Sequence, residues 1–107
     1  MSPERFPVSL DVEGQVATLT ANEAHMEIPL AGEFEEACTK LLDTGQPAMV
    51  IDFMQVRTIQ SCLIGEVAKT KVIAHDAQRK LKLVTNPKIG EIFRMILNDL
   101  VEIEIRD

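Results

Sequence analysis

Two neighbouring residues, Ser61 and Cys62, are the side chains of this sequence best suited to chemistry. A serine hydroxyl can accept a phosphoryl group, and a thiol at a helix start is favoured as a thiolate by the helix dipole. The apolar residues Leu63, Ile64 and Val67 follow at helical spacing and predict a helix that begins here. Each residue also has a structural alternative. Ser61 would cap the helix, and Cys62 would pack as a small apolar residue.

The sequence offers little acid–base or metal-binding chemistry to support catalysis. Its only histidines, His25 and His75, have no cysteine or carboxylate at a recognised metal-ligand spacing. His75 comes late in the same predicted helix, about 20 Å from Ser61 at a rise of about 1.5 Å per residue. The five glycines are single, and no phosphate-binding loop occurs. We therefore predict no catalytic residue, no metal and no cofactor. A small enzyme or nucleotide binder that uses Ser61 or Cys62 remains a lesser alternative.

Composition and charge limit the kinds of partner. The 107 residues are 46% hydrophobic and 26% charged, with four Phe and no Trp or Tyr, which predicts one domain with an aliphatic core. A formal net charge of −6 argues against nucleic acid or an anionic membrane as the main partner, because both require a dominant basic surface. Residues 1–52 contain ten acidic side chains and two basic ones, whereas six of the eleven basic residues fall within 69–88.

The sequence also predicts a cytoplasmic protein. Its first residues lack the apolar segment of a secretory signal. No stretch approaches the roughly 20 apolar residues that a membrane helix needs. Cys38 and Cys62 are the only cysteines, and two isolated thiols in such a chain are expected to be reduced.

The elements that would position Ser61 alternate between strand and helix. Strands are predicted at residues 8–12, 16–20, 48–53, 81–85 and 101–105. Helices are predicted from about residue 31 to Gly45, over 61–77, and from the N-cap Asn86 to about residue 100. Glu13-Gly14 predicts the turn of an antiparallel hairpin between the first two strands. Residues 22–30 are predicted to be a loop that includes a short extended piece.

This order predicts an α/β fold, with a mostly parallel sheet, an N-terminal antiparallel hairpin and three helices, because strands separated by helices pair in parallel. The nearly continuous apolar run at 48–53 predicts a central strand covered on both faces. The third helix has the most regular apolar stripe, formed by Ile89, Ile92, Phe93, Ile96, Leu97 and Leu100.

In such sheets, binding sites form where the carboxyl ends of strands meet the following helices. Three segments should converge at that edge, namely residues 20–23, 58–62 and 85–86. The partner-binding residues predicted from them are Asn22, Glu23, Thr58, Gln60, Ser61, Cys62 and Asn86.

The segment Val50-Ile-Asp-Phe-Met-Gln-Val-Arg-Thr-Ile-Gln-Ser-Cys-Leu-Ile-Gly-Glu-Val67 resembles the central segment of STAS domains. This family comprises the anti-anti-sigma factors and their relatives in stressosomes, lipid-transport complexes and anion transporters. Ile51-Asp52 matches the family's strand end, and Ser61 aligns with its phosphorylatable hydroxyl. Residues 80–87 resemble the family's next strand and turn. The family's aspartate before the serine is Gln60 here, and the glycine two positions after it is Leu63.

The resemblance spans residues 8–105 in element order and implies a single STAS-like domain over residues 1–107. It implies a non-catalytic domain that binds an anti-sigma factor, a serine-kinase-like protein or a related scaffold, with Ser61 as the phosphorylation site. In the family, the unmodified form sequesters the anti-sigma factor and frees a sigma factor for transcription, and phosphorylation ends that binding. Gln60 leaves a second function open, that of a never-phosphorylated subunit of a stressosome or transporter complex. Neither function involves nucleic acid or membrane insertion, and both leave a homodimer open.

Overall fold

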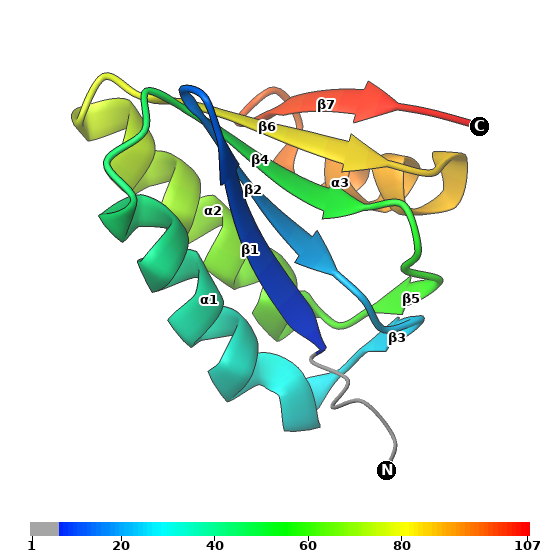
Figure 1. The fold of residues 1–107 in the computed structure, drawn as a ribbon. Coiled ribbons are helices and arrows are strands. Elements are labelled where there is room, and N and C mark those ends of the chain that lie inside the picture. The colour runs from blue at the N-terminus through cyan, green and yellow to red at the C-terminus, as the bar shows by residue number, and fades with distance from the viewer. Residues whose placement is uncertain (1–6) are drawn as a thin grey trace, which may run out of the picture.

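The computed structural model of the chain describes residues 7–107, which form an α/β fold (Figure 1). A five-stranded sheet consists, in spatial order, of β1 (Val8–Glu13), β2 (Val16–Ala21), β4 (Ala48–Phe53), β6 (Lys80–Thr85) and β7 (Glu102–Ile105). The helices are α1 (Ala31–Asp43), α2 (Ser61–Asp76) and α3 (Pro87–Leu97). Between β2 and α1 lie β3 (His25–Met26) and the 3-10 turn η1 (Ile28–Leu30), and β5 (Thr58–Ile59) follows β4. The predicted domain bounds include residues 1–6, which lie outside the described residues.

The strand pairing confirms the predicted fold class. β1 and β2 pair antiparallel, with Glu13 opposite Val16, so that Gly14 and Gln15 form the turn. Gly14 has a φ of 62°, a left-handed conformation that glycine adopts without strain. All other neighbours in the large sheet pair in parallel. Residues 22–30 contain the predicted extended piece, β3, which pairs in parallel with β5 in a separate small sheet.

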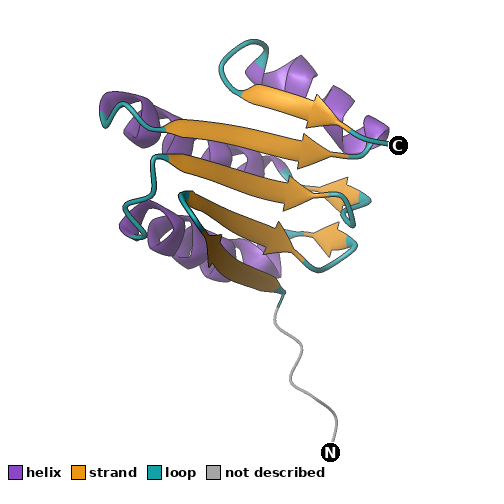
Figure 2. Ribbon diagram, turned by 45° about the horizontal axis from the view of Figure 1, so that its top comes forward, coloured by secondary structure: helices purple, strands orange, loops and turns teal. Residues whose placement is uncertain are grey.

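All three helices cover the same face of the sheet, and the opposite face carries no helix (Figure 2). The prediction that residues 48–53 are covered on both faces is therefore wrong. Met49, Ile51 and Phe53 are buried beneath the helices, whereas the alternate residues of β4 are only half-buried. β4 keeps an apolar residue, Val50, on the open face because it is the middle strand. Neighbouring side chains shield that face. One of them is Lys82, whose Nζ lies 3.0 Å from Oε1 of Glu104 on β7.

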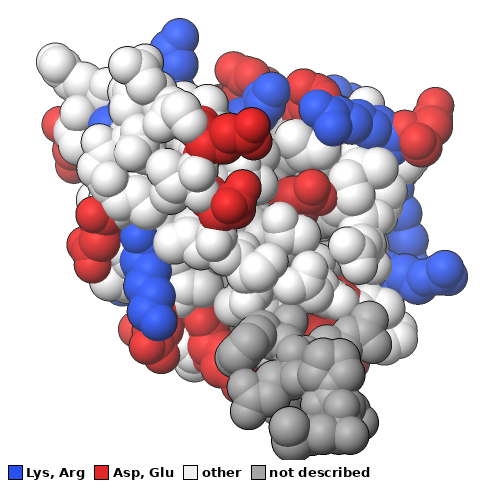
Figure 3. Space-filling view, viewed as in Figure 1, with Lys and Arg blue, Asp and Glu red and all other residues white. Residues whose placement is uncertain are grey.

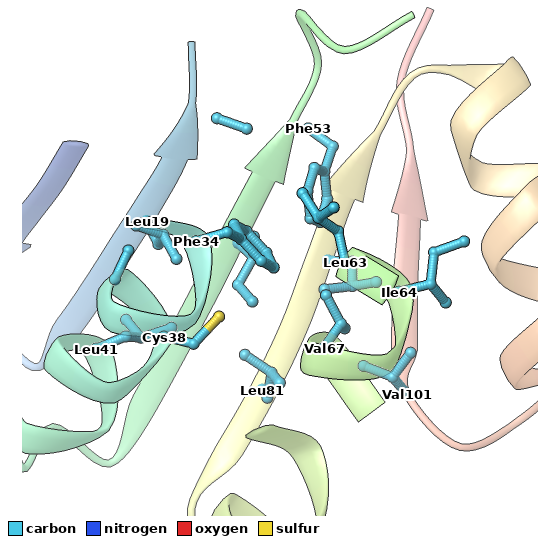
Figure 4. Packing of buried hydrophobic residues seen from close by; sticks show 14 of the residues in the cluster. Leu19, Phe34, Cys38, Leu41, Phe53, Leu63, Ile64, Val67, Leu81 and Val101 are labelled. Carbon is cyan, nitrogen blue, oxygen red and sulfur yellow. The ribbon is translucent and has the colours of Figure 1, made fainter. Parts of the chain in front are cut away.

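The core lies between the sheet and the helices (Figure 4). Phe53 of β4 is at its centre, with its ring centroid 6.0 Å from that of Phe34 and 5.1 Å from that of Phe93. These rings join α1 and α3 through the central strand, and the remaining core is aliphatic, as predicted. Cys38 of α1 packs in this core, where burial raises the pKa of its thiol to about 11.

The apolar stripe of the third helix is buried only in its first half. Ile89 and Phe93 are fully buried, but Ile96 is 54% exposed and Leu100 is 44% exposed. The helix ends at Leu97, because Asn98 adopts a φ of 54° and turns the chain toward β7. Leu100 therefore lies beyond the helix whose periodicity suggested its burial. No helix within residues 7–107 combines the length and apolarity needed to cross a bilayer.

Candidate functional site

The small β3·β5 sheet holds residues 24–28 against residues 57–60 at the carboxyl edge of the large sheet (Figure 1). The backbone N–H groups of Arg57 and Thr58 donate to the Ala24 carbonyl at 2.7 and 3.0 Å. Gln60 N–H donates to the carbonyl of Met26 at 3.0 Å, and the Met26 side chain is fully buried. This ladder fixes the chain immediately before Ser61, so the predicted segment 58–62 meets residues 24–26, which directly follow the predicted segment 20–23.

Side chains tie the same two segments together. His25 Nδ1 lies 2.8 Å from Thr58 Oγ1, which is hydrogen-bond distance. The Oε1 atom of Gln60 accepts a hydrogen bond from the backbone N–H of Ile28. Thr58 and Gln60, both predicted to bind a partner, therefore also hold the loop that leads into α2.

Ser61 is the first residue of α2, and it is exposed. The N-cap residue is Gln60, with extended backbone at φ −89° and ψ 154°, and its carbonyl accepts from Leu63 N–H at 3.0 Å. The capping interpretation of Ser61 is therefore wrong, because the N-cap lies one residue earlier. The Ser61 hydroxyl makes no hydrogen bond to any residue of 7–107, so it can be approached from outside.

The outward face of α2 continues from Ser61 with small and apolar side chains, beside the exposed Lys69. Gly65 and Val72 are exposed on it, and Ala68 is half-buried between them. Val72 is 51% exposed, on a helix that packs against α1 on another side. Cys62 lies beside this face as an exposed free thiol. We call Ser61, Cys62, Gly65, Ala68 and Val72 the α2 surface.

Asn86 braces the third segment of the edge. Its Oδ1 accepts from Ile89 N–H at 2.9 Å, which confirms the predicted N-cap of α3. Its Nδ2 donates to the carbonyls of Met54 at 3.2 Å and Val56 at 2.7 Å. Asn86 therefore connects α3 to the β4–β5 loop. An open hollow of about 640 Å³ lies between that loop and the start of α3.

Asn22 and Glu23 lie on the β1 side of this edge. The backbone N–H of Asn22 donates to the Pro7 carbonyl at 2.8 Å, and its Nδ2 donates to Ser9 Oγ at 3.2 Å. Both residues are half-buried. Asn22 therefore fastens the start of β1, and it is joined to the Ser61 segment through Ala24.

The sequence interpretation missed the roles of His25, Met26 and the Gln60 side chain at this edge. Ala24, Met26, Ile28 and Leu30 place an apolar residue at every second position, and this short alternation was the available signal that the loop contains an extended piece anchored in the core. The hydrogen bonds of His25 and Gln60 join residues more than 30 positions apart and leave no periodic trace in the sequence.

The chemical groups that this edge exposes are the hydroxyl of Ser61 and the thiol of Cys62. Among residues 7–107, no three His, Cys, Asp or Glu side chains are grouped so that they could hold a metal ion. His75 lies near the far end of α2 from Ser61. Within the described range, no side chain hydrogen-bonds to Ser61 or Cys62 as a general base would.

The Gln60 contact gives a local prediction. Replacing Gln60 with alanine removes the acceptor for Ile28 N–H, and a typical hydrogen bond contributes about 0.5–1.5 kcal/mol. We expect amide hydrogen exchange at Ile28 to become about 2- to 10-fold faster. Gln55→Ala is the matched control, because Gln55 is exposed and makes no hydrogen bond to residues 7–107. Equal exchange rates at Ile28 in both variants would contradict the anchoring role of Gln60.

Comparison with known proteins finds solved structures that share this fold. No protein-family model matches the chain, and no curated protein matches it. The crystal structure of TM1081 from Thermotoga maritima, named as a candidate anti-sigma factor antagonist, matches it with a TM-score of 0.80. The two chains are 18% identical, and the match covers 94% of this chain and 86% of that one.

The NMR structure of the same protein matches with a TM-score of 0.76 at 19% identity, over 98% of this chain and 84% of the other. At such low identity the likeness concerns the fold alone. It confirms the STAS-like arrangement that the sequence predicted, with an antiparallel hairpin followed by parallel strands and three helices.

Proposed function

We propose that this chain is a single non-catalytic STAS-like domain that binds a partner protein through the carboxyl edge of its sheet and the α2 surface. The partner would be an anti-sigma factor, a serine-kinase-like protein or a related scaffold, which would place the domain in the cytoplasm. The observation that carries this proposal is the exposed Ser61 hydroxyl at the first residue of α2. The fold shared with a candidate anti-sigma factor antagonist supports it.

Phosphorylation of Ser61 would act as the switch. A phosphate adds a charge of about −1.5 to −2 and interacts favourably with a helix N-terminus. Because the hydroxyl is exposed, the domain need not rearrange to accept it. A partner packed on the α2 surface would then have to desolvate a dianion, so binding would weaken.

We expect Ser61→Asp to weaken partner binding at least tenfold, about 1.4 kcal/mol, because it places a carboxylate on the α2 surface. Ser61→Ala should bind within about threefold of the unmodified chain, since a change of that size is under about 0.7 kcal/mol. The measurement is the dissociation constant for the protein that co-purifies with the unmodified chain. Thr39→Asp is the charge control, because Thr39 is an exposed residue of α1. Equal binding by the two Ser61 variants would remove the charge switch.

A second function, that of a constitutive assembly subunit, is favoured by the Gln60 contact. The position that carries aspartate in the family here holds the Ile28 N–H through an amide oxygen. A residue engaged in this way does not offer a carboxylate to a kinase, so Ser61 would then never be phosphorylated.

The two functions differ in the mass of the native protein. Intact mass measurement on protein from its own cells, with peptide mapping over residues 59–69, tests for one phosphate on Ser61. Its presence supports the switch. Its absence across growth and stress conditions, together with a stable co-purifying partner, supports the constitutive subunit.

A further inference from the structure

Strand β1 is an open edge of the large sheet. Among residues 7–107, no strand pairs with its outer side. Its pairing with β2 runs without a bulge from Val8 to Glu13, and it contains neither proline nor lysine. Natural sheets usually protect an edge with one of these features, because unpaired N–H and C=O groups attract another strand. β1 lacks these three features, and its charged side chains, Asp11 and Glu13, are both acidic, so they would disfavour an acidic strand and not a basic one.

The register identifies the backbone groups that face outward. The hydrogen bond from Asn22 N–H to the Pro7 carbonyl marks a hydrogen-bonded pair at the start of the hairpin. Such pairs alternate along an antiparallel ladder. Ser9, Asp11 and Glu13 therefore bond to β2. The N–H and C=O groups of the other residues point to the open edge, and these residues are Val8, Leu10 and Val12.

A pocket lies beside this edge, between β1 and α1. Its volume is about 240 Å³, and its lining includes the apolar residues Leu10, Leu19 and Ala37. Leu10 and Val12 are 38% and 46% exposed, so the apolar side of β1 is not fully covered by α1. The pocket is large enough for one aliphatic side chain of an added strand, because removing such a side chain from a protein core leaves a cavity of smaller volume than this.

The rim of the pocket is acidic. Glu33, Glu36 and Lys40 lie on it. Glu36 Oε1 is 3.4 Å from Lys40 Nζ, whereas Glu33 forms no ion pair with any residue of 7–107. Asp11 and Glu13 are two further carboxylates of β1, on the face of the sheet opposite the pocket. Figure 3 looks onto this side of the molecule and shows acidic side chains beside uncharged surface.

We propose that the β1 edge binds an extended, basic segment of another protein, which adds as a further strand of the sheet. Backbone pairing with Val8, Leu10 and Val12 holds the segment. One of its apolar side chains enters the pocket, and a lysine or arginine next to that side chain pairs with Glu33. A second copy of this chain fits less well, because β1-to-β1 pairing brings the acidic rims of both copies to one seam. This surface is separate from the α2 surface, so it would be a second interaction site.

The test is an NMR titration with capped synthetic six-residue peptides. One alternates lysine with valine, one alternates glutamate with valine, and one carries proline at alternate positions so that it cannot pair. We expect the lysine–valine peptide to slow amide exchange at Val8, Leu10 and Val12 and to bind at least fivefold more tightly than the other two. Protection confined to other residues, or no binding at millimolar peptide, would overturn the proposal.

A charge-matched pair of variants tests the role of Glu33. Glu33→Lys should lower the affinity for the lysine–valine peptide about fivefold, since exposed ion pairs contribute up to about 1 kcal/mol. Glu91→Lys on α3 makes the same change of net charge at an exposed site on another helix and should change affinity less than twofold. Equal losses of affinity in the two variants would show that net charge alone attracts the peptide, and they would overturn the proposed site. If the protein self-associates without peptide and the same amides become protected, the edge binds a second copy of this chain instead.

Discussion

Replacing Gly90 with alanine should lower the free energy of unfolding by up to about 3 kcal/mol, the upper part of the range for overpacking. A Cβ at this position would lie 2.6 Å from both Thr85 Oγ1 and Ile105 Cγ1. Both are side-chain atoms of the last residues of β6 and β7, and Thr85 is fully buried, so a Cβ at Gly90 would force these side chains out of their present rotamers. The change is measured by equilibrium chemical denaturation.

Gly65→Ala is the matched control for Gly90→Ala. Gly65 also lies inside a helix, but a Cβ there meets nothing within 4 Å. Alanine should therefore stabilise α2 by about 0.5–1 kcal/mol, the ordinary advantage of alanine over glycine in a helix. The two substitutions are chemically identical and are expected to act with opposite signs. Stabilisation by both would mean that α3 does not cross β6 and β7 closely at Gly90.

The close crossing at Gly90 has no counterpart in the sequence pattern. A glycine within an apolar helical stripe predicts only a local cost, because its effect on packing depends on what lies opposite. Here the neighbours are the last residues of β6 and β7. The contact therefore depends on the order of the strands, which periodicity does not describe.

Periodicity was sufficient for the long elements. The alternation in β2 and the spacing of Phe34, Cys38 and Leu41 in α1 each reflect burial of one face, and burial of one face is what a periodic pattern encodes. Gly45 was predicted to end the first helix, and its φ of 71° shows the left-handed conformation typical of that position.

The pattern failed where burial depends on more distant parts of the chain. β4 is apolar on two faces although one face has no helix, because a middle strand is shielded by its neighbours. Ile96 continues the stripe of α3 but is exposed near the end of the helix, where less of the protein covers it. β3 and β5 have two residues each, too few for any period, and they form only through contact with each other.

Periodicity also predicted only part of the candidate site. The start of α2 was predicted from apolar spacing, and that placed Ser61 correctly to within one residue of the helix boundary. Its surroundings could not be predicted in this way. Gln60 reaches Ile28 and Thr58 meets His25 only because the small β3·β5 sheet aligns those segments. Whether these residues contact a partner stays a prediction.

Asn86→Ala should destabilise the protein by about 2–4 kcal/mol, the second large effect. Loss of an N-cap costs about 0.5–2 kcal/mol, and the Ile89 N–H would lose its acceptor. Two hydrogen bonds to the carbonyls of Met54 and Val56 would also be lost, at about 0.5–1.5 kcal/mol each. Asn86 is half-buried, so water can replace these bonds only in part.

Asn86→Ser separates the two roles of this side chain. Serine is also a good N-cap residue, but its single hydroxyl cannot cap α3 and bond both carbonyls of the β4–β5 loop. We expect it to cost about 1–2 kcal/mol, less than Asn86→Ala, in the same denaturation experiment. Hydrogen exchange in the β4–β5 loop should accelerate in both variants, whereas the first turn of α3 should be affected mainly by alanine. Equal stability of the two variants would mean that capping contributes nothing and that the loop contacts carry the whole effect. Because this loop leads through β5 to Ser61, Asn86 would then act on the proposed binding edge as a positioning residue, and its place on that edge would not require contact with the partner.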